Sequence, residues 1–318
     1  MAGFPTLPKA WFVLGPSKKF GKEPTGFKLY NKKFVIFRTE DGKLNAMRAN
    51  CPHMGVNLAC GGKVKGNRIV CPLHGWEFDR DGSCAKIPST NVIPEFAHIP
   101  SFPVEERHGV AYIWNGPKAD YPLPFFPDEA PEDFEGAKPY EVHQTTSWFG
   151  PVVNAFDIQH FIYSHNRIPI KDSEYDLSQK NVARVKHFYK LVGKYWFEEL
   201  LRKVFGQIVE LEATIWGGNV IITKSTLGKF TNYMISYCTP VEGRKARTDL
   251  VLYRKKSNNP IGWLVNKIML PIQAKLCQKI FQDESDELFE AIIRDDRLHP
   301  ENDVMVSKYL NWFKNCHA

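Results

Sequence analysis

Short runs of alternating apolar and polar residues, separated by turn signals, dominate the first third of the chain. Lys33 to Glu40 is rich in β-forming residues, Asp41-Gly42 supplies a two-residue turn, and Lys43 to Ala49 returns along it. The same pattern occurs twice more, as Trp76–Arg80 with Ser83–Ile87 around Asp81-Gly82, and as Val104–Arg107 with Val110–Trp114 around His108-Gly109. The pattern predicts a compact all-β domain.

A cluster of prolines follows this β-rich part. Prolines stand at positions 117, 122, 124, 127, 131 and 139, within a short acidic stretch. Proline at this density is incompatible with a regular element and indicates a linker. We therefore predict two domains, residues 1–118 and residues 119–318.

The second part of the chain mixes helical and strand patterns. Trp148 to His165 has a helical centre, while Val209 to Thr226 and Phe230 to Tyr253 are typical of long strands. Pro271 to Arg294 predicts a helix that begins at its proline, with an apolar repeat at Ile272, Leu276, Ile280 and Leu288. The order of helix, strands and helix predicts an α+β domain.

Composition and charge exclude several classes of protein. With 43% hydrophobic and 24% charged residues, the chain is neither disordered nor fibrous. The chain has no apolar run of 18 residues, and its start, Met1-Ala-Gly-Phe-Pro, lacks a secretion signal, so we expect a cytoplasmic protein without a membrane span. The net charge of +7 comes from scattered basic runs such as Arg254 to Lys256. These runs indicate solvated loops or weak steering of an acidic partner, and no nucleic-acid-binding stripe.

Two tight pairs of metal-binding residues stand in the β-rich part. Seven cysteines, an odd number, favour metal binding over a disulfide framework. Cys51-Pro-His53 and Cys71-Pro-Leu-His74 form the pattern C-x-H-x17-C-x2-H. Two thiolates could hold one iron of a [2Fe–2S] cluster while two imidazoles hold the other. The alternative is a zinc ion held by the same four residues.

The spacing resembles the signature of Rieske proteins, which implies that Cys51, His53, Cys71 and His74 bind a Rieske-type [2Fe–2S] cluster. Rieske proteins of respiratory complexes have one further cysteine in each ligand loop, joined as a disulfide. Val56 and Leu73 occupy those positions here, and we expect Cys60 and Cys84 to be buried thiols. The stretch from Cys71 to Gly82 resembles instead the Rieske domain of ring-hydroxylating oxygenases.

A second motif lies in the helical segment. Asn154, Asp157, His160 and His165 have the form N-x2-D-x2-H-x4-H. Spacing of three residues would place Asn154, Asp157 and His160 along one helix face. His165 would point about 140° away from His160 on a regular helix, so the helix must end or distort for both imidazoles to reach one metal. Taken alone, such a segment is more often a polar surface or a hydrogen-bonded core network than a metal site.

The motif D-x2-H-x4-H resembles the mononuclear-iron motif of Rieske non-haem iron oxygenases. That resemblance implies an α+β, helix-grip-like catalytic domain with an antiparallel sheet, in which His160 and His165 bind a mononuclear Fe(II). It implies that Asp157 bridges to a Rieske histidine of a neighbouring subunit and that Asn154 lies beside the iron. The third ligand of a facial triad would be a downstream carboxylate. Gln282-Asp283 resembles the family pattern best, so Asp283 is the predicted ligand and Asp286 the alternative.

The resemblance implies an enzyme that uses O2 and electrons from a ferredoxin or a flavin-containing NAD(P)H reductase. The chain has no glycine-rich dinucleotide fingerprint, so NAD(P)H and flavin would belong to that partner. Family members form head-to-tail trimers, and we therefore expect a homotrimer. The run from Cys51 to Leu58 with Gly61-Gly62 resembles the branch of cholesterol 7-desaturases and ketosteroid hydroxylases. We therefore predict hydroxylation or desaturation of a hydrophobic, sterol-like or polycyclic substrate.

Three alternatives stay open at this point. Within the enzyme class, O- or N-demethylation and aromatic dihydroxylation use the same kind of centre. A pure Rieske electron carrier needs only the first ~115 residues. A Rieske module fused to a non-catalytic lipid-binding domain would have no iron at His160 and His165.

Overall fold

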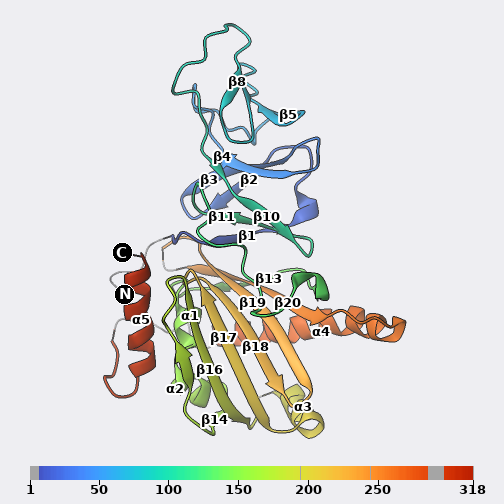
Figure 1. Cartoon of the computed structure of the whole chain (residues 1–318), viewed down its shortest axis with the longest axis vertical. Helices are drawn as coiled ribbons and strands as arrows, with labels where there is room; N and C mark the ends of the chain where they lie inside the picture. The colour runs from blue at the N-terminus through green and yellow to red at the C-terminus, as the bar shows by residue number, and fades with distance from the viewer. Residues whose placement is uncertain (1–6, 194, 244, 286–296, 318) are drawn as a thin grey trace. The chain divides into compact units, whose positions relative to one another are not determined.

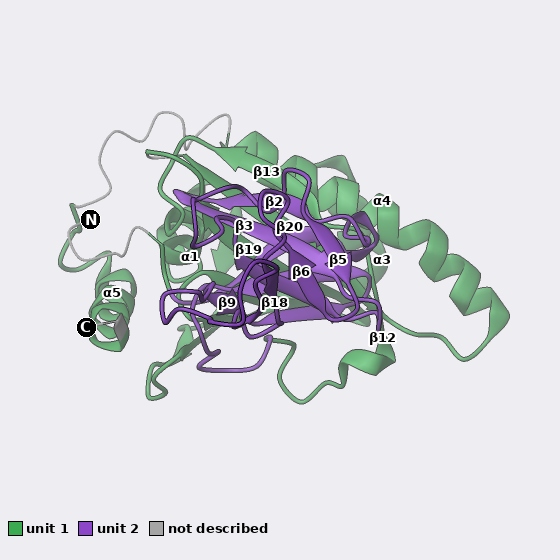
Figure 2. Cartoon of the chain, turned by 90° about the horizontal axis from the view of Figure 1, so that it is seen from above, with its two compact units in different colours: residues 1–8, 124–318 green, residues 9–123 purple. Residues whose placement is uncertain are grey.

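The computed structural model describes residues 7–193, 195–243, 245–285 and 297–317 (Figure 1). Within it, Lys9–Leu123 form one compact unit and the chain from Pro124 onward forms the main body of another (Figure 2). The division falls inside the proline-rich stretch, and the domain boundary near residue 118 remains a prediction.

Three small antiparallel sheets make up the unit of Lys9–Leu123. The first contains β1 (Trp11–Pro16), β11 (Val110–Trp114) and β10 (Val104–Arg107). The second contains β2 (Thr25–Leu29), β3 (Lys32–Arg38), β4 (Leu44–Arg48) and β9 (Ser101–Phe102). The third contains β5 (Lys63–Lys65), β6 (Arg68–Val70), β7 (Glu77–Phe78) and β8 (Cys84–Lys86). All three predicted hairpins are confirmed, as β3–β4, β7–β8 and β10–β11.

The core of this unit reaches the two cysteine loops. Val35, Phe37 and Met47 of the second sheet are fully buried against a cluster that also contains Cys51 and Cys71. Burying apolar area of this kind is the main stabilising contribution to such a small domain. The loops that hold the candidate ligands are therefore anchored in the core.

One large antiparallel sheet forms the body of the other unit. Its strands, in spatial order, are β12 (Phe134–Gly136), β20 (Ala246–Lys255), β19 (Phe230–Pro240), β18 (Val220–Leu227), β17 (Ile208–Trp216), β16 (Val182–Leu191) and β14 (Arg167–Pro169), with β13 (Tyr140–Gln144) also paired to β20 and β15 (Glu174–Asp176) to β16. Each stretch predicted as a long strand is thus a hairpin. The chain reverses at Gly217-Gly218 between β17 and β18, and again between the end of β19 at Pro240 and the start of β20 at Ala246.

Helices pack on one face of this sheet. They are α1 (Gly150–Asn154), α2 (Ile158–Tyr163), α3 (Trp196–Phe205), α4 (Pro260–Glu284) and α5 (Val304–His317). Because successive strand side chains alternate between the two faces, every second residue of a strand lies on the face that the helices cover. Ala183 and Val185 of β16 contact the cluster of α1 and α5, while Leu250 and Leu252 of β20 contact α4.

Helix α4 begins eleven residues before the predicted start. Asn259 caps it by accepting a hydrogen bond from the Gly262 N–H at 2.7 Å, and Pro260 occupies the first position of the helix. Pro271, the predicted first residue, lies inside the helix on its exposed side. The predicted end at Arg294 lies outside the described residues. No helix in the described part of the chain is both long and apolar enough to cross a membrane.

We expect Gly82→Ala to destabilise the unit of Lys9–Leu123 far more than Gly42→Ala, although both glycines follow Asp in hairpin turns. Both have positive φ, +92° and +84°, so alanine is strained at each by about 1 kcal/mol. A Cβ on Gly82 would also lie 1.7 Å from the Ile99 carbonyl oxygen, whereas a Cβ on Gly42 would meet nothing within 4 Å. Moving that backbone would also disturb the hydrogen bond from Ile99 N–H to the Gly82 carbonyl. The additional cost should be about 2–4 kcal/mol, measured by urea denaturation; equal midpoints would contradict it.

Candidate metal centres and the adjoining cavity

The two Cys/His loops of the first unit have the same backbone geometry. In one, the Cys51 N–H donates to the Val56 carbonyl and the Gly55 N–H donates to the Cys51 carbonyl. In the other, Cys71 N–H donates to the Trp76 carbonyl and Gly75 N–H to the Cys71 carbonyl. Gly55 and Gly75 have φ of +74° and +70°, which favours glycine at both positions. The two loops therefore present their ligands as a matched pair.

The four side chains of these loops separate into a buried and an exposed set. Cys51 and Cys71 are buried, while the rings of His53 and His74 are exposed with their Nδ1 atoms 3.2 Å apart. The indole of Trp76 stacks on His53, with ring centroids 4.7 Å apart and planes 6° apart. The sequence predicted that these four residues form one site. The structure places His53 beside His74, as that prediction requires.

This donor set fits a [2Fe–2S] cluster of the Rieske type. Burial raises the pKa of the Cys51 thiol to about 11, and the neighbouring Cys71 thiol adds to the rise. Such thiols become thiolates when a metal ion supplies positive charge beside them. Two thiols and two imidazoles are the donors that hold the two irons of a Rieske centre, one pair on each iron. Leu73 is exposed and Val56 half-buried in the positions where a disulfide would stand in respiratory proteins.

The remaining cysteines do not join this centre. None of the seven cysteines, all within the described residues, forms a disulfide. Cys84 is buried as expected, and burial raises the pKa of its thiol. Cys60 is exposed, which corrects the prediction of a buried thiol. It lies in the loop before β5, where the chain turns at the surface.

The second motif lies on two short helices rather than on one. Helix α1 ends at Asn154, and Asp157 is the N-cap of α2, accepting a hydrogen bond from the His160 N–H at 3.1 Å. The predicted single face through Asn154, Asp157 and His160 is therefore wrong. The competing preference is local, because an aspartate side chain readily caps a new helix and interrupts the old one.

The chain leaves α2 before it reaches His165. The helix ends at Tyr163, and Asn166 has φ of +51°, so the backbone turns back immediately after His165. This break, expected from the spacing, brings the Nε2 atoms of His160 and His165 to 3.0 Å from each other. On β16, the ring of His187 donates to the Ala155 carbonyl at 2.8 Å and so holds the loop between α1 and α2.

A carboxylate completes a cluster with these two histidines. Glu284 Oε1 lies 2.8 Å from His160 Nε2, and Glu284 Oε2 lies 3.7 Å from His165 Nε2. Among the described residues, these three have donor atoms within 4.8 Å of one another. Asn154 Nδ2 donates to Glu284 Oε1 at 3.4 Å. Asn154 therefore contacts this cluster through the carboxylate of Glu284.

Glu284, and not Asp283, stands beside the histidines. Asp283 instead forms an ion pair with Lys279 at 3.0 Å, one turn back on the exposed side of α4. Consecutive helix residues differ by about 100° around the axis, so only one of the two can face the histidines. The prediction of Asp283 therefore disagrees with the geometry. Asp286, the alternative, lies outside the described residues.

Burial sets the charge states of this cluster. The side chains of His160, His165 and Glu284 are 10%, 19% and 10% exposed. Burial lowers the pKa of His165 to about 4, although Glu284 opposes the shift, so its imidazole is neutral at pH 7. Burial also opposes the charge of Glu284, but the hydrogen bond from His160 and the two nearby imidazoles hold the pKa of that carboxyl below its usual value. Two imidazoles and one carboxylate are the donor set of a non-haem Fe(II) facial triad.

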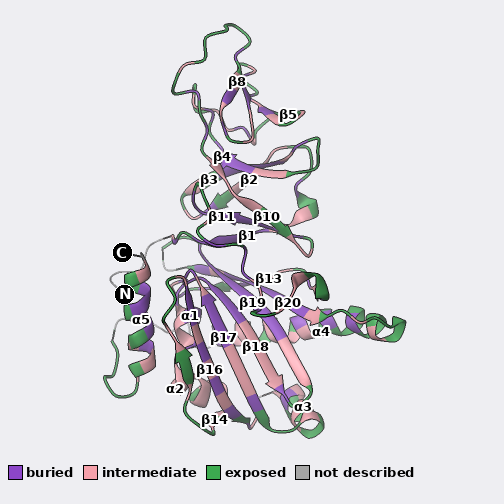
Figure 3. Ribbon diagram, in the orientation of Figure 1, coloured by how far each residue is buried: buried purple, intermediate pink, exposed green. Residues whose placement is uncertain are grey.

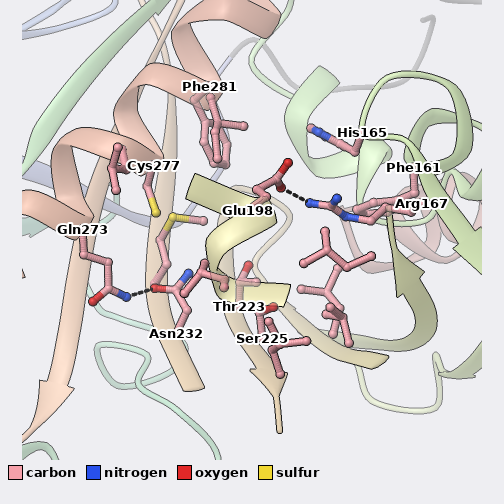
Figure 4. A pocket seen from close by; sticks show the side chains of 18 of the residues that line it. Phe161, His165, Arg167, Glu198, Thr223, Ser225, Asn232, Gln273, Cys277 and Phe281 are labelled. Atoms are coloured by element: carbon pink, nitrogen blue, oxygen red, sulfur yellow. Dashed lines mark hydrogen bonds and ion pairs between the residues drawn. The ribbon is translucent and has the colours of Figure 1, made fainter. Parts of the chain in front are cut away.

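A mostly apolar cavity of about 450 Å³ adjoins the cluster, between the helices and the covered face of the sheet. His160, His165 and Glu284 lie in its wall, together with apolar residues of α3, α4 and strands β16 to β19. This volume falls within the range of cavities that enclose a small organic molecule. Cys277 also lines it, and burial raises the pKa of that thiol to about 12 (Figure 4).

Two polar pairs in the cavity wall were not anticipated from the sequence (Figure 4). Gln273 Nε2 donates to Asn232 Oδ1 at 2.5 Å, and Arg167 pairs with Glu198 at 2.5 Å. Arg167 and Glu198 are both largely buried, so each ion neutralises the other. Each pair joins elements far apart in the chain, and no local pattern marks it.

Comparison with known proteins agrees with the first centre. Residues 10–103 match the family model of the Rieske [2Fe-2S] domain. The chain is 34% identical over 180 residues to cholesterol 7-desaturase nvd 1 of Ciona intestinalis, which covers 55% of this chain and 37% of that protein. It is 34% identical over 168 residues to a probable 3-ketosteroid-9-alpha-monooxygenase oxygenase component of Rhodococcus rhodochrous, covering 51% and 42%. The matched regions thus span less than half of these relatives.

Solved structures extend the comparison to both units. Dicamba monooxygenase bound to dicamba aligns with a TM-score of 0.67 at 19% identity, over 97% of each chain. A mutant of NdmA from Pseudomonas putida CBB5 with caffeine aligns with a TM-score of 0.67 at 19% identity, over 96% of this chain and 89% of that one. Identity at this level establishes shared fold alone. The chain therefore contains a Rieske [2Fe-2S] domain and has the fold of the Rieske oxygenases, the family that its sequence resembles.

Proposed function

We propose that this protein is the oxygenase component of a Rieske system that hydroxylates or desaturates a hydrophobic, sterol-like substrate. The observation that carries the proposal is the buried cluster of His160, His165 and Glu284 in the wall of an apolar cavity. Cys51, His53, Cys71 and His74 would hold the [2Fe–2S] cluster, and His160, His165 and Glu284 would hold the mononuclear iron. When bound, these groups would supply single-electron transfer and the reduction of O2.

The protein's own residues would prepare the reaction by position and by exclusion of water. The apolar wall would hold a hydrocarbon skeleton against the triad, where few polar groups compete for it. Asn154, bonded to Glu284, would fix the orientation of that carboxylate. Asp157 keeps His160 at the start of α2 through its cap. We also propose Asp157 as the bridge to a Rieske histidine of a neighbouring chain in a homotrimer.

The substrate proposal rests on two observations that agree. The relatives are named for the oxidation of cholesterol and ketosteroids. The cavity combines a long apolar lining with the Asn232–Gln273 pair, which would hydrogen-bond one oxygen of an otherwise apolar ligand. Electrons would come from a ferredoxin or a flavin-containing NAD(P)H reductase, as expected for an oxygenase component. The cytoplasmic location expected from the sequence remains a prediction.

Replacing Glu284 by alanine should remove one iron per chain, whereas replacing the adjacent Asp283 should remove none. Anaerobically purified protein should contain about three irons and two acid-labile sulfides per chain. Glu284→Ala and His160→Ala should each lower the iron count by about one and leave the sulfide count and the absorbance of the cluster unchanged. Asp283→Ala is the matched control, because its carboxylate faces Lys279.

Different iron counts would separate the alternatives. Two irons to two sulfides in the unsubstituted protein, unchanged in Glu284→Ala, would indicate an electron carrier joined to a non-catalytic domain. If Asp283→Ala lost one iron and Glu284→Ala kept its full iron count, the third iron ligand would be Asp283, as predicted from the sequence. Zinc without sulfide would refute both centres.

Gln273→Leu should weaken the binding of a sterol that has one hydroxyl group by about threefold to tenfold, because one neutral hydrogen bond is lost. Binding of the matched hydrocarbon without the hydroxyl should change little, since the leucine keeps the size of the side chain. Gln278→Leu is the control, because Gln278 lies on the same helix and bonds the Glu141 carbonyl outside the cavity. Titration of the purified protein with both ligands measures the difference; an equal loss for both would argue against a polar contact at Gln273.

A further inference from the structure

Large apolar side chains of α3 and α4 face solvent around the mouth of the cavity. We call this set the α3–α4 surface; it consists of Trp196, Leu200 and Val204 of α3 and Ile261, Trp263, Leu264, Val265, Ile268, Met269 and Ile272 of α4. Trp196 and Ile261 are 74% and 77% exposed, which is far from the burial that such side chains usually have in a soluble protein. Exposed residues mark α3 and the N-terminal part of α4 (Figure 3).

The α3–α4 surface is continuous with the cavity. Leu200, Met269 and Ile272 belong to it and also line the cavity. An apolar path therefore runs from solvent, between α3 and α4, to the histidines in the cavity wall.

The charge along α4 is one-sided. From residue 260 to residue 282 this helix has no acidic residue and three lysines, Lys267, Lys275 and Lys279, of which Lys279 pairs with Asp283. On α3, the exposed Glu199 pairs with Lys203. Lys267 and Lys275 are exposed on α4. The ammonium of Lys267 lies over the ring of Trp263, 3.8 Å from its centroid. Tryptophan beside lysine, within an apolar helix face, is the composition of segments that lie in the interface of a bilayer.

We propose that the α3–α4 surface binds the face of a lipid bilayer that has anionic headgroups, and that apolar substrate passes from the bilayer into the cavity. The first part stands on exposure and charge alone; the second rests on the proposed function. Apolar side chains would enter the boundary between headgroups and acyl chains, while the lysines would meet anionic phosphates. A bilayer fits better than an acidic protein, because the surface is broad and apolar with its charges interspersed.

Vesicle flotation of the purified, iron-loaded protein tests the proposal. The protein should bind vesicles of phosphatidylcholine with phosphatidylglycerol, bind phosphatidylcholine alone more weakly, and lose binding as salt rises. Trp196→Ser combined with Trp263→Ser should weaken binding about tenfold or more. Lys267→Glu combined with Lys275→Glu should weaken binding to the anionic vesicles by about the same factor. If the tryptophan variant does not fold, the lysine variant tests the proposal by itself.

Val241→Ser is the matched control. Val241 is also an exposed apolar residue, but it follows the end of β19 opposite to Phe230, which lines the cavity. The Val241→Ser variant should bind vesicles as tightly as the unsubstituted protein does. His160→Ala should lose iron and keep vesicle binding, so failure of the proposed function would be distinguishable from failure of this proposal.

Two results would overturn the proposal. One is equal vesicle binding, or equal lack of it, in the unsubstituted protein and both surface variants. The other is a decrease in oligomer size, measured by light scattering, in the tryptophan or lysine variants. That decrease would show that the α3–α4 surface is an interface between copies of this chain.

Discussion

The buried contact of Glu284 with His160 and His165 determines the arrangement of the second unit. A carboxylate at 10% exposure is costly unless partners compensate its charge, and its partners come from α2 and the turn after it. The contact therefore ties the C-terminal end of α4 to a segment more than a hundred residues earlier in the chain. Leu270 and Ala274 pack on the sheet and hold the rest of α4 along its covered face, and the cavity is the space enclosed between them.

The side-chain pattern of the sheet also determines where the core and the cavity lie. Alternation along β16 to β20 places one set of side chains toward the helices, and this set is apolar where α1, α4 and α5 pack. Where no helix packs closely, the same face becomes the wall of the cavity and includes polar residues such as Thr223, Ser225 and Asn232. A single periodicity therefore forms both the core and the binding wall, and the polar residues lie where packing leaves room.

Features set by local spacing could be predicted from the sequence. The Asp-Gly turns, the Cys/His loops and the break before His165 depend on residues within a few positions of one another. Glu284 could not be chosen over Asp283 in this way, because the choice depends on the rotation of α4 about its axis. The start of α4 had a signal at Asn259-Pro260, but Pro271 offered a second proline as a possible first helix residue, eleven positions later. The Asn232–Gln273 pair could not be predicted, because the two residues are 41 positions apart and only the tertiary fold brings them together.

Helix α4 combines two requirements that a helix of a soluble domain rarely meets together. Its inner side, through Leu270 and Ala274, must be apolar to pack on the sheet. Its outer side, through Ile261 and Ile268, is apolar as well, although it faces solvent. A helix that is apolar on both sides is stable in water only where something covers the second side or where its exposure serves binding. Because these exposed side chains gather beside the cavity mouth and among lysines, packing alone does not account for them, and contact with an apolar, anionic partner does.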